Sequence, residues 1–411
     1  MNNDLKAIQR VAPQGVNEAN LQLRCLRLQD LGPAEIAAWR ALDEQALEPN
    51  PYLSPQFLLP VMRHLDPKGQ IVLAVVESGD PRRRELCALA PLLSTEASRY
   101  LPLTHCRLQA SLHSFLNGVL VRRTDARRHL EALVDQGRRY MGHGLVLEAC
   151  RADGPTDALL REIAAERDMR RVEVEAYLRA GMRPADMGEA DLAARLPSKA
   201  KKLRSCMRKL AKFGEVDFRV WRGAAITDEV IERHLALEHM GWKGDNGSSL
   251  RSHRAHEDFF REMARGFAAD NRALFAELSV GGRVIASSSN LIAGNVGAAF
   301  KIGFDPEFAA MGPGIVCELE LMRCAPTVLA DVDHVDSGSV AGSYIEDLWP
   351  LRRRMAAVCY STSPVGNLAL LAVSQLRSIK RLLRDPLAAP EADDAVATEV
   401  RVPAARGVLL D

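Results

Sequence analysis

The segment from Phe304 to Gly314, FDPEFAAMGPG, constrains the fold of this chain more than any other. It follows a strand-like run at 296–303 and leads directly into an apolar helical pattern. Glycine at 312 and 314 lets another group approach the backbone without meeting a Cβ, and the intervening Pro313 suits the first turn of a helix. A strand, a glycine-bearing turn and a helix N-terminus together present free N–H groups at the positive end of a helix dipole. The segment predicts either an ordinary helix cap or a site that holds phosphate.

The composition is that of a soluble globular protein with room for two domains. The chain has 411 residues, and its 54 Lys and Arg almost cancel its 53 Asp and Glu. A formal charge of +1 gives no global attraction to nucleic acid or anionic membranes, so we expect no DNA partner. No apolar run approaches the roughly 20 residues of a membrane helix. The sequence gives no oligomeric state.

The cysteines and the first residues both favour the cytoplasm. None of the eight cysteines forms a CxxC pair, and their scattered positions fit a reducing compartment better than a disulfide scaffold. The start, MNNDLKAIQRVAPQG, lacks the apolar core of a signal peptide.

Strand and helix patterns alternate along the chain, which predicts an α/β or α+β fold. In the first half, strands are expected at 71–78, 86–93, 115–121, 144–149 and 171–178, with helices at 55–64, 125–140 and 156–168. In the second half, strands are expected at 273–280, 283–292, 296–303, 331–336 and 355–362, with helices at 226–239, 252–268, after Gly314, at 343–348 and at 366–384. The shared order predicts two similar domains with a boundary near 180–197.

Several strings resemble the CelD-type acyltransferases of bacterial cellulose and exopolysaccharide biosynthesis. They are GWKGDNGSSLRSHRAHEDFF, GGRVIA, FKIGFDPEFAAMGPG and DSG. The resemblance covers 197–350 well and is fainter in the first half. It implies membership of the GNAT superfamily, with a more distant similarity to the tandem-GNAT Fem-type aminoacyl transferases.

The resemblance implies tandem GNAT-like domains, each a mixed, mostly antiparallel sheet flanked by helices. We expect a flexible N-terminus at 1–20, a degenerate GNAT-like domain at 21–190, an acyltransferase domain at 191–386 and a disordered tail at 387–411. The implied reaction is transfer of an acyl group, most simply acetyl, from an acyl-CoA by direct attack on the thioester. The implied acceptor is an amine or hydroxyl of a small metabolite or a saccharide.

Two departures from the family pattern stand out. The pyrophosphate loop usually begins with Gln or Arg, whereas the frame here is Ala309-x-x-Gly312-x-Gly314. Related sequences carry Tyr-Lys after the Asp-x-Gly, whereas this chain has Tyr344-Ile345. A non-catalytic protein that keeps the fold therefore stays an alternative.

The expected donor site combines the glycine turn with the strand before it. Its residues are Phe300, Ile302, Met311, Gly312, Pro313 and Gly314. Period-two geometry predicts one face with Phe300 and Ile302 and an opposite face with small residues and Lys301. The small face would leave room for a pantetheine arm, unless it is merely solvated.

Two residues are expected to carry chemistry. The resemblance makes Tyr344 the donor of a proton to the departing thiolate, with a tyrosine covering the core as the alternative. Asp336 ends a strand before Ser337-Gly338, which predicts a carboxylate at the mouth of the site as base or orienting group. The alternative for Asp336 is a turn in which it bonds its own backbone. Asp331, Asp333, His334 and Asp336 lie on both faces of that strand, so we expect no metal ion.

Four residues are expected to contact the acceptor: Glu238, Trp242, Lys243 and Lys301. The first three belong to a helix end and a glycine-rich loop, LEHMGWKGDNGSS, and such loops commonly carry function. Trp242 could stack on a sugar or seal the core, and Lys301 could be a solvated edge charge instead.

The run at 198–214, SKAKKLRSCMRKLAKFG, predicts a basic amphipathic helix with an apolar stripe of Leu203, Met207 and Leu210. Such a helix most often has a solvated basic face. If the basic face is functional, it would contact the 3′-phosphate of CoA, an acidic polysaccharide, or tRNA in a Fem-like aminoacyl transferase. Without interleaved aromatic residues, tRNA is the least supported.

Overall fold

The computed structural model describes residues 21–78, 85–108 and 111–384, so the expectations for 1–20 and 387–411 lie outside the described residues. The strands are β1 (Leu21–Leu26), β2 (Ile71–Ser78), β3 (Leu86–Thr95), β4 (His105–Arg107), β5 (Leu120–Val121), β6 (Gly144–Arg151), β7 (Arg171–Met182), β8 (Val216–Arg222), β9 (Ala273–Val280), β10 (Arg283–Ala293), β11 (Val296–Phe304), β12 (His334–Asp336) and β13 (Leu351–Ser361). The helices are α2 (Pro33–Glu44), α3 (Pro55–Pro60), α4 (Ala126–Gly137), α5 (Pro155–Glu166), α6 (Glu189–Arg195), α7 (Pro197–Leu210), α8 (Asp228–His239), α9 (Trp242–Asp245), α10 (Arg254–Ala269), α11 (Pro313–Val328) and α12 (Pro364–Arg384), with short 3-10 helices that include η8 (Pro306–Met311) and η9 (Tyr344–Asp347).

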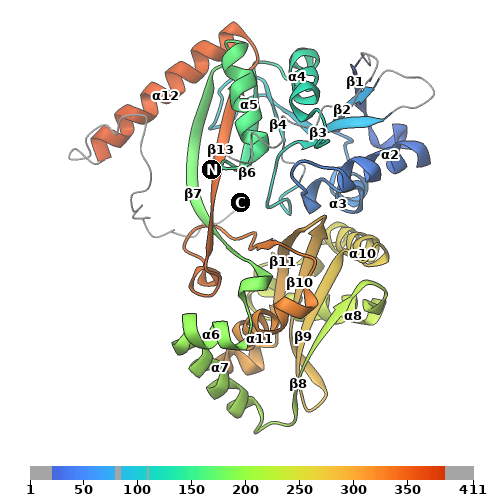
Figure 1. Cartoon of the computed structure of the whole chain (residues 1–411), viewed down its shortest axis with the longest axis vertical. Coiled ribbons are helices and arrows are strands. Elements are labelled where there is room, and N and C mark those ends of the chain that lie inside the picture. The colour runs from blue at the N-terminus through green and yellow to red at the C-terminus, as the bar shows by residue number, and fades with distance from the viewer. Residues whose placement is uncertain (1–20, 79–84, 109–110, 385–411) are drawn as a thin grey trace.

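The expected mixed, mostly antiparallel sheet flanked by helices is confirmed, but the two halves share one sheet. Its strand order is β1-β2-β3-β4-β6-β13-β7-β12-β11-β10-β9-β8, with β5 paired to β3. Two lobes are visible, linked by the long strands β7 and β13 (Figure 1). The pair of β7 with β12 joins the sheet of one lobe to that of the other.

The last part of the chain packs with the first lobe. Strand β13 lies between β6 and β7, and α12 packs against β13 and β7. The expected domain boundary near residue 190 assigned these residues to the second domain. The sequence alone does not show that β13 pairs with β6 and β7 of the first lobe. The described second lobe therefore runs from α6 to η9, and residues 351–384 complete the first lobe.

Most expected elements are present, with shorter strands at two positions. Of the run at 115–121 only β5 is strand, and of 331–336 only β12 is strand. The helix expected at 55–64 is α3 followed by a π-helical turn at Val61–Leu65. Strands β1, β4 and β8 and helices α2, α6 and α9 were not expected. No helix within the described ranges is long and apolar enough to cross a membrane.

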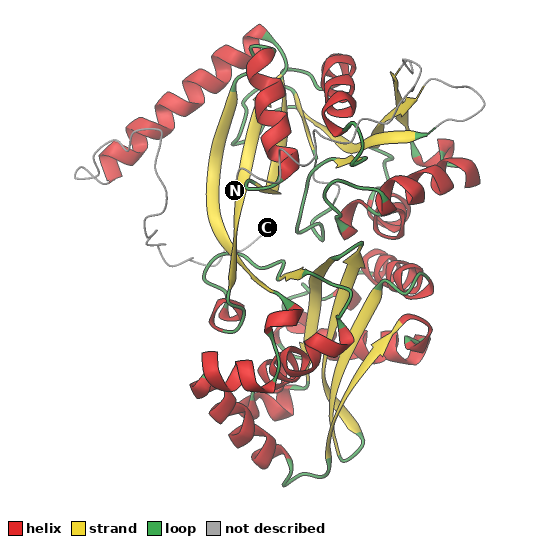
Figure 2. Ribbon diagram, viewed as in Figure 1, coloured by secondary structure: helices red, strands yellow, loops and turns green. Residues whose placement is uncertain are grey.

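The lobes meet over a shared aromatic core. Tyr52 and Phe57 of the first lobe are buried with Phe259, Phe260 and Phe300 of the second. The Phe57 ring packs edge-on against the Phe259 and Phe300 rings, with centroids 5.4 and 6.2 Å away. In the second lobe, α8 and α10 cover one face of the sheet, and α6, α7 and α11 cover the other (Figure 2). This core fixes β11 against the first lobe.

Candidate active site at β11 and the α11 N-terminus

Strand β11 carries a β-bulge at Phe300. Ser289 of β10 pairs with Lys301, whereas the next residue, Asn290, pairs with Ala299. Phe300 is therefore an extra residue on β11, and a bulge of this kind bends its strand and redirects the side chains around it.

The bulge corrects the expectation that Phe300 and Ile302 share one face. Phe300 lies in the core beneath α10, whereas Ile302 and Phe304 lie within contact of Gly314 on the α11 side. The reason is the extra residue, which shifts the two-residue period by one position. Of the two, Ile302 is therefore the one beside the glycine turn.

The turn before α11 has an open backbone. Gly312 adopts a left-handed conformation with φ 61° and ψ 50°, and a Cβ built there would meet no atom within 4 Å. Pro313 takes the first helical position as expected, and no side chain caps the helix. Met311 and Gly312 are half-buried, whereas Pro313 and Gly314 are buried. The N–H groups at 314 and 315 thus lie at an uncapped helix N-terminus, which favours an anion.

Strands β11 and β12 part beside this turn. They pair in parallel only from Val296–His334 to Ala298–Asp336, after which the chain turns away at Ser337. Residues 299–304 therefore have no strand partner on that side within the described part of the chain, and we call this region the β11–β12 fork. A fork between parallel strands at their carboxyl ends is a common place for a ligand.

Three of the four expected acceptor residues lie close together at β11: Glu238, Lys243 and Lys301. The Lys243 ammonium donates to the carbonyl oxygen of Ile302 (2.8 Å) and lies 3.4 Å from a carboxylate oxygen of Glu238. Glu238 is buried, and its other oxygen accepts from the Leu250 N–H (2.8 Å). Trp242 begins α9, but its side chain lies outside what the structure describes.

A glycine sets the distance between this cluster and β11. A Cβ on Gly303 would lie 2.3 Å from the backbone nitrogen of Glu238, well inside any contact distance. Only glycine therefore lets α8 pack this closely on the strand.

Lys301 lies at the junction of the lobes. Its ammonium is 5.1 Å from the ring centre of Phe115 in the first lobe and 5.6 Å from that of Phe300. Burial, together with the positive charge of Lys243, lowers the pKa of Lys301 to about 8. A lysine with this pKa exchanges protons near neutral pH.

Asp336 does not lie free at the mouth of the site, which corrects the expectation. It is 2% exposed, and one carboxylate oxygen accepts from the Gly338 N–H (2.8 Å) and lies 3.3 Å from Arg179. The Arg179 guanidinium also donates to the carbonyl oxygens of Phe115 and Ser339. Asp336 thus bonds its own turn and is held by a buried cation from β7, because β7 pairs with β12 at this point.

Tyr344 begins η9 and is 49% exposed. Partial burial of its hydroxyl, with the nearby Glu318 carboxylate, raises the pKa of Tyr344. Glu318 is buried on α11 and has one carboxylate oxygen without a partner among the described residues. Burial raises the pKa of Glu318 to about 7. Near neutral pH Tyr344 keeps its proton and Glu318 is partly protonated, so both can donate a proton on the α11 side of the sheet.

The basic helix expected at 198–214 is α7, with its apolar stripe turned inward. Leu203, Cys206 and Leu210 are buried and Met207 is half-buried. Lys201, Lys202, Arg204, Arg208, Lys209 and Lys212 are exposed, whereas Lys199 is partly buried and pairs with Asp347. Most of the basic face is thus solvated.

The sequence offered weak signals for the residues that were missed. Glu318 is a charge inside the apolar run IVCELELM, which is unusual for a buried helix. Phe115 and Arg179 carried no signal, because they reach the site only through the pairing of the two lobes.

One family matches the part of the chain that contains this geometry. Residues 197–342 match the acetyltransferase (GNAT) domain. The match includes β11, the glycine turn and α11, and it ends just before Tyr344. A search of curated protein sequences finds no match to the chain.

Solved structures match this chain over about four fifths of its length. FemX matches with a TM-score of 0.51 and 12% identity, over 79% of this chain and 95% of that chain. A conserved protein of unknown function from Bacteroides thetaiotaomicron VPI-5482 matches with a TM-score of 0.50 and 14% identity, over 80% of this chain and 98% of that one. A tandem GNAT protein from the clavulanic acid biosynthesis pathway gives a TM-score of 0.41 and 15% identity, over 84% and 99% of the two chains. The first two establish likeness of fold alone.

Proposed function

We propose that the second lobe binds an acyl-CoA and that the protein transfers its acyl group, most simply acetyl, to an amine or hydroxyl acceptor. One observation carries the proposal: an uncapped α11 N-terminus lies beside the β11–β12 fork, within the region that matches the GNAT domain. The expected CelD-like acceptor, sugar-derived or a small metabolite, and the cytoplasmic location belong to this proposal. The eight free cysteines favour a reducing compartment.

The residues present fit the donor. The N–H groups at 314 and 315 would hold the pyrophosphate, with Met311, Gly312 and Pro313 shaping the turn. The edge of β11 after Ala298, which has no strand partner on the β12 side among the described residues, and the side chain of Phe304 would line the pantetheine arm. Acyl-CoA would supply an activated thioester at this position.

Lys301 is the proposed base on the acceptor side of β11. In its neutral form the amine takes a proton from the attacking group of the acceptor. The positive charge of Lys243 helps to populate this neutral form, because it lowers the pKa of Lys301. Glu238 orients Lys243 through their ion pair (3.4 Å). On the other side of the sheet, Tyr344 donates a proton to the departing sulfur, with Glu318 as the neighbouring proton reservoir. Asp336 and Arg179 position the turn between these groups.

Replacing Lys243 by methionine will raise the pKa of Lys301 from about 8 toward its ordinary 10.5, because a neighbouring positive charge is removed. A base works in its neutral form, so the competent fraction rises as pH increases through that pKa. The pKa of Lys301 is obtained by measuring, at a series of pH values, how fast acetic anhydride labels this lysine, with mass spectrometry as the readout. The exposed Lys202→Met variant serves as the control and leaves the curve in place. An unchanged curve in Lys243→Met would contradict the coupling.

Calorimetry with acetyl-CoA tests the donor site. The Gly312→Asp variant puts a carboxylate at the α11 N-terminus, where it competes with phosphate, so we expect binding to weaken by at least about tenfold. Gly69→Asp is the matched control, because Gly69 has a similar φ of 59° and equally open space in the first lobe. Equal affinity in the two variants would rule out the turn as the pyrophosphate site.

A Fem-like transfer from charged tRNA is the second candidate, favoured by the exposed basic face of α7 and the FemX-like fold. It predicts RNA binding that weakens steeply with salt. RNA binding without acetyl-CoA binding would support it, and binding of neither ligand would favour a non-catalytic interaction protein.

A further inference from the structure

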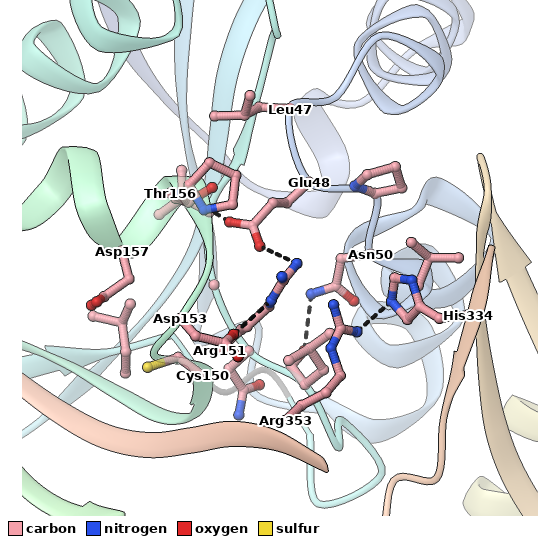
Figure 3. A pocket seen from close by; sticks show the side chains of 18 of the residues that line it. Leu47, Glu48, Asn50, Cys150, Arg151, Asp153, Thr156, Asp157, His334 and Arg353 are labelled. Carbon is pink, nitrogen blue, oxygen red and sulfur yellow. Dashed lines mark hydrogen bonds and ion pairs between the residues drawn. The ribbon is translucent and has the colours of Figure 1, made fainter. Parts of the chain in front are cut away.

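A second polar site lies where the lobes meet, at the end of β11 and β12 away from the fork. The pocket has a volume of about 510 Å³. Figure 3 shows Glu48, Arg151 and Thr156 of the first lobe on one side and His334 with Arg353 on another. A space of this size accepts a sugar-sized molecule.

Each carboxylate that lines this pocket already has a partner. The pairs are Glu48 and Asp153 with Arg151 at 3.1 and 2.8 Å, Asp157 with Arg161 and Arg171 at 2.8 and 3.0 Å, and Asp333 with the Asn295 amide. Glu48 also accepts from the Thr156 N–H at the start of α5 (2.8 Å). Glu48, Asp153 and Asp157 are therefore each paired with an arginine, whereas the Asp333 carboxylate accepts from a neutral amide.

The lining also contains Arg183, Arg352 and Arg353, and of these three Arg353 of β13 is the buried one. It is 8% exposed, and within the described ranges no carboxylate lies within 4 Å of its guanidinium. Its hydrogen bond goes to the His334 ring (Figure 3). Burial and the charge of Arg151 lower the pKa of Arg353, and the more distant carboxylates of Asp336, Asp153 and Glu48 offset this only in part. A buried cation with no anion in direct contact is unfavourable.

The His334 ring cannot supply the missing negative charge. Burial and the charges of Arg353, Arg151 and Arg183 lower the pKa of His334 to about 3, so the ring is neutral near pH 7. Because its Nε2 accepts from Arg353, its own proton is on Nδ1. The buried Thr156 hydroxyl, also in the lining, has no partner among the described residues. The pocket thus combines a buried guanidinium that contacts no carboxylate with further hydrogen-bond donors.

We propose that this inter-lobe pocket binds the anionic group of a small phosphorylated or carboxylated molecule, with Arg353 as its counter-ion. Arg353 comes from β13, His334 from β12 and Thr156 from α5, so one ligand would contact all three segments. The site is distinct from the donor turn, because Val296 and His334 begin their strands whereas the glycine turn follows the end of β11.

Calorimetry on the full chain tests this site with four probes: inorganic phosphate, glucose 1-phosphate, glucuronate and neutral glucose. We expect one or more of the anionic probes to bind and glucose not to bind. Comparing the two phosphate probes with glucuronate then shows whether a phosphate or a carboxylate is preferred. Arg353→Met should weaken binding at least about tenfold, because a charge-assisted hydrogen bond is lost. The exposed Arg219→Met variant is the control and should bind like the wild type.

Two further measurements separate a binding role from a structural one. Without ligand, Arg353→Met should melt at the same temperature as the wild type or higher, because a buried charge that contacts no carboxylate is removed. Gly312→Asp should keep the binding of anionic probes that depends on Arg353, because the donor turn is elsewhere. The proposal is overturned if no anion binds the wild type, if Arg353→Met binds equally well or melts several degrees lower, or if Gly312→Asp abolishes binding.

Discussion

Replacing Lys301 by methionine will reduce acceptor-dependent release of free thiol from acetyl-CoA by roughly 10²–10⁴-fold, the usual contribution of a general base. Acetyl-CoA affinity will change little, because Lys301 lies on the acceptor side of β11 and faces Phe115 of the first lobe. The lysine is suited to this role since its pKa of about 8 leaves a useful neutral fraction near neutral pH. An acceptor for this assay comes from pooled bacterial metabolites screened by thiol release.

Lys202→Met is the matched control for this prediction, because Lys202 is an exposed lysine on α7. It should retain wild-type rates. A Lys301→Met variant that releases thiol within about threefold of the wild-type rate would remove Lys301 from the chemistry, since a general base contributes far more. The proposed base would then have to be sought elsewhere.

Arg179→Met will lower the free energy of unfolding by about 3–5 kcal/mol, because removing one partner leaves the Asp336 carboxylate buried without a counter-ion. Both side chains are almost fully buried, with 3% and 2% exposed. The same guanidinium donates to carbonyl oxygens of both lobes, so the substitution also removes a link between Phe115 and Ser339. Urea unfolding followed by circular dichroism measures the change.

An exposed ion pair gives the comparison for Arg179. Arg219 lies 2.6 Å from Asp217, but the two side chains are 65% and 42% exposed. Arg219→Met should therefore change stability by less than about 1 kcal/mol. If both variants lose the same small amount of unfolding free energy, the buried pair of Arg179 and Asp336 does not stabilise the protein more than an exposed pair does.

The sequence predicted the features that depend on local pattern. The glycines at 312 and 314 and Pro313 have a local cause in turn and helix geometry, and the turn has the expected form. Glu238, Lys243 and Lys301 were each expected to contact the acceptor, and the structure places them close together at β11. Their roles remain predictions.

Features that depend on non-local pairing were missed. The bulge at Phe300 arises from the register of β10 against β11, and an alternating pattern gives no sign of an extra residue. Asp336 was assigned to the mouth of the site because Arg179, 157 residues earlier, cannot be linked to it without the β7–β12 pair. The return of β13 to the first lobe has the same cause.

Amide chemical shifts of ¹⁵N-labelled protein during titration with CoA report directly on the proposed pyrophosphate site. Binding at this site requires the resonances of Gly312, Gly314 and Ile315 to shift with a single affinity, while that of Gly69 stays fixed. Saturating CoA that leaves these three amides unchanged, or that moves only resonances at α7 or the inter-lobe pocket, would contradict this assignment.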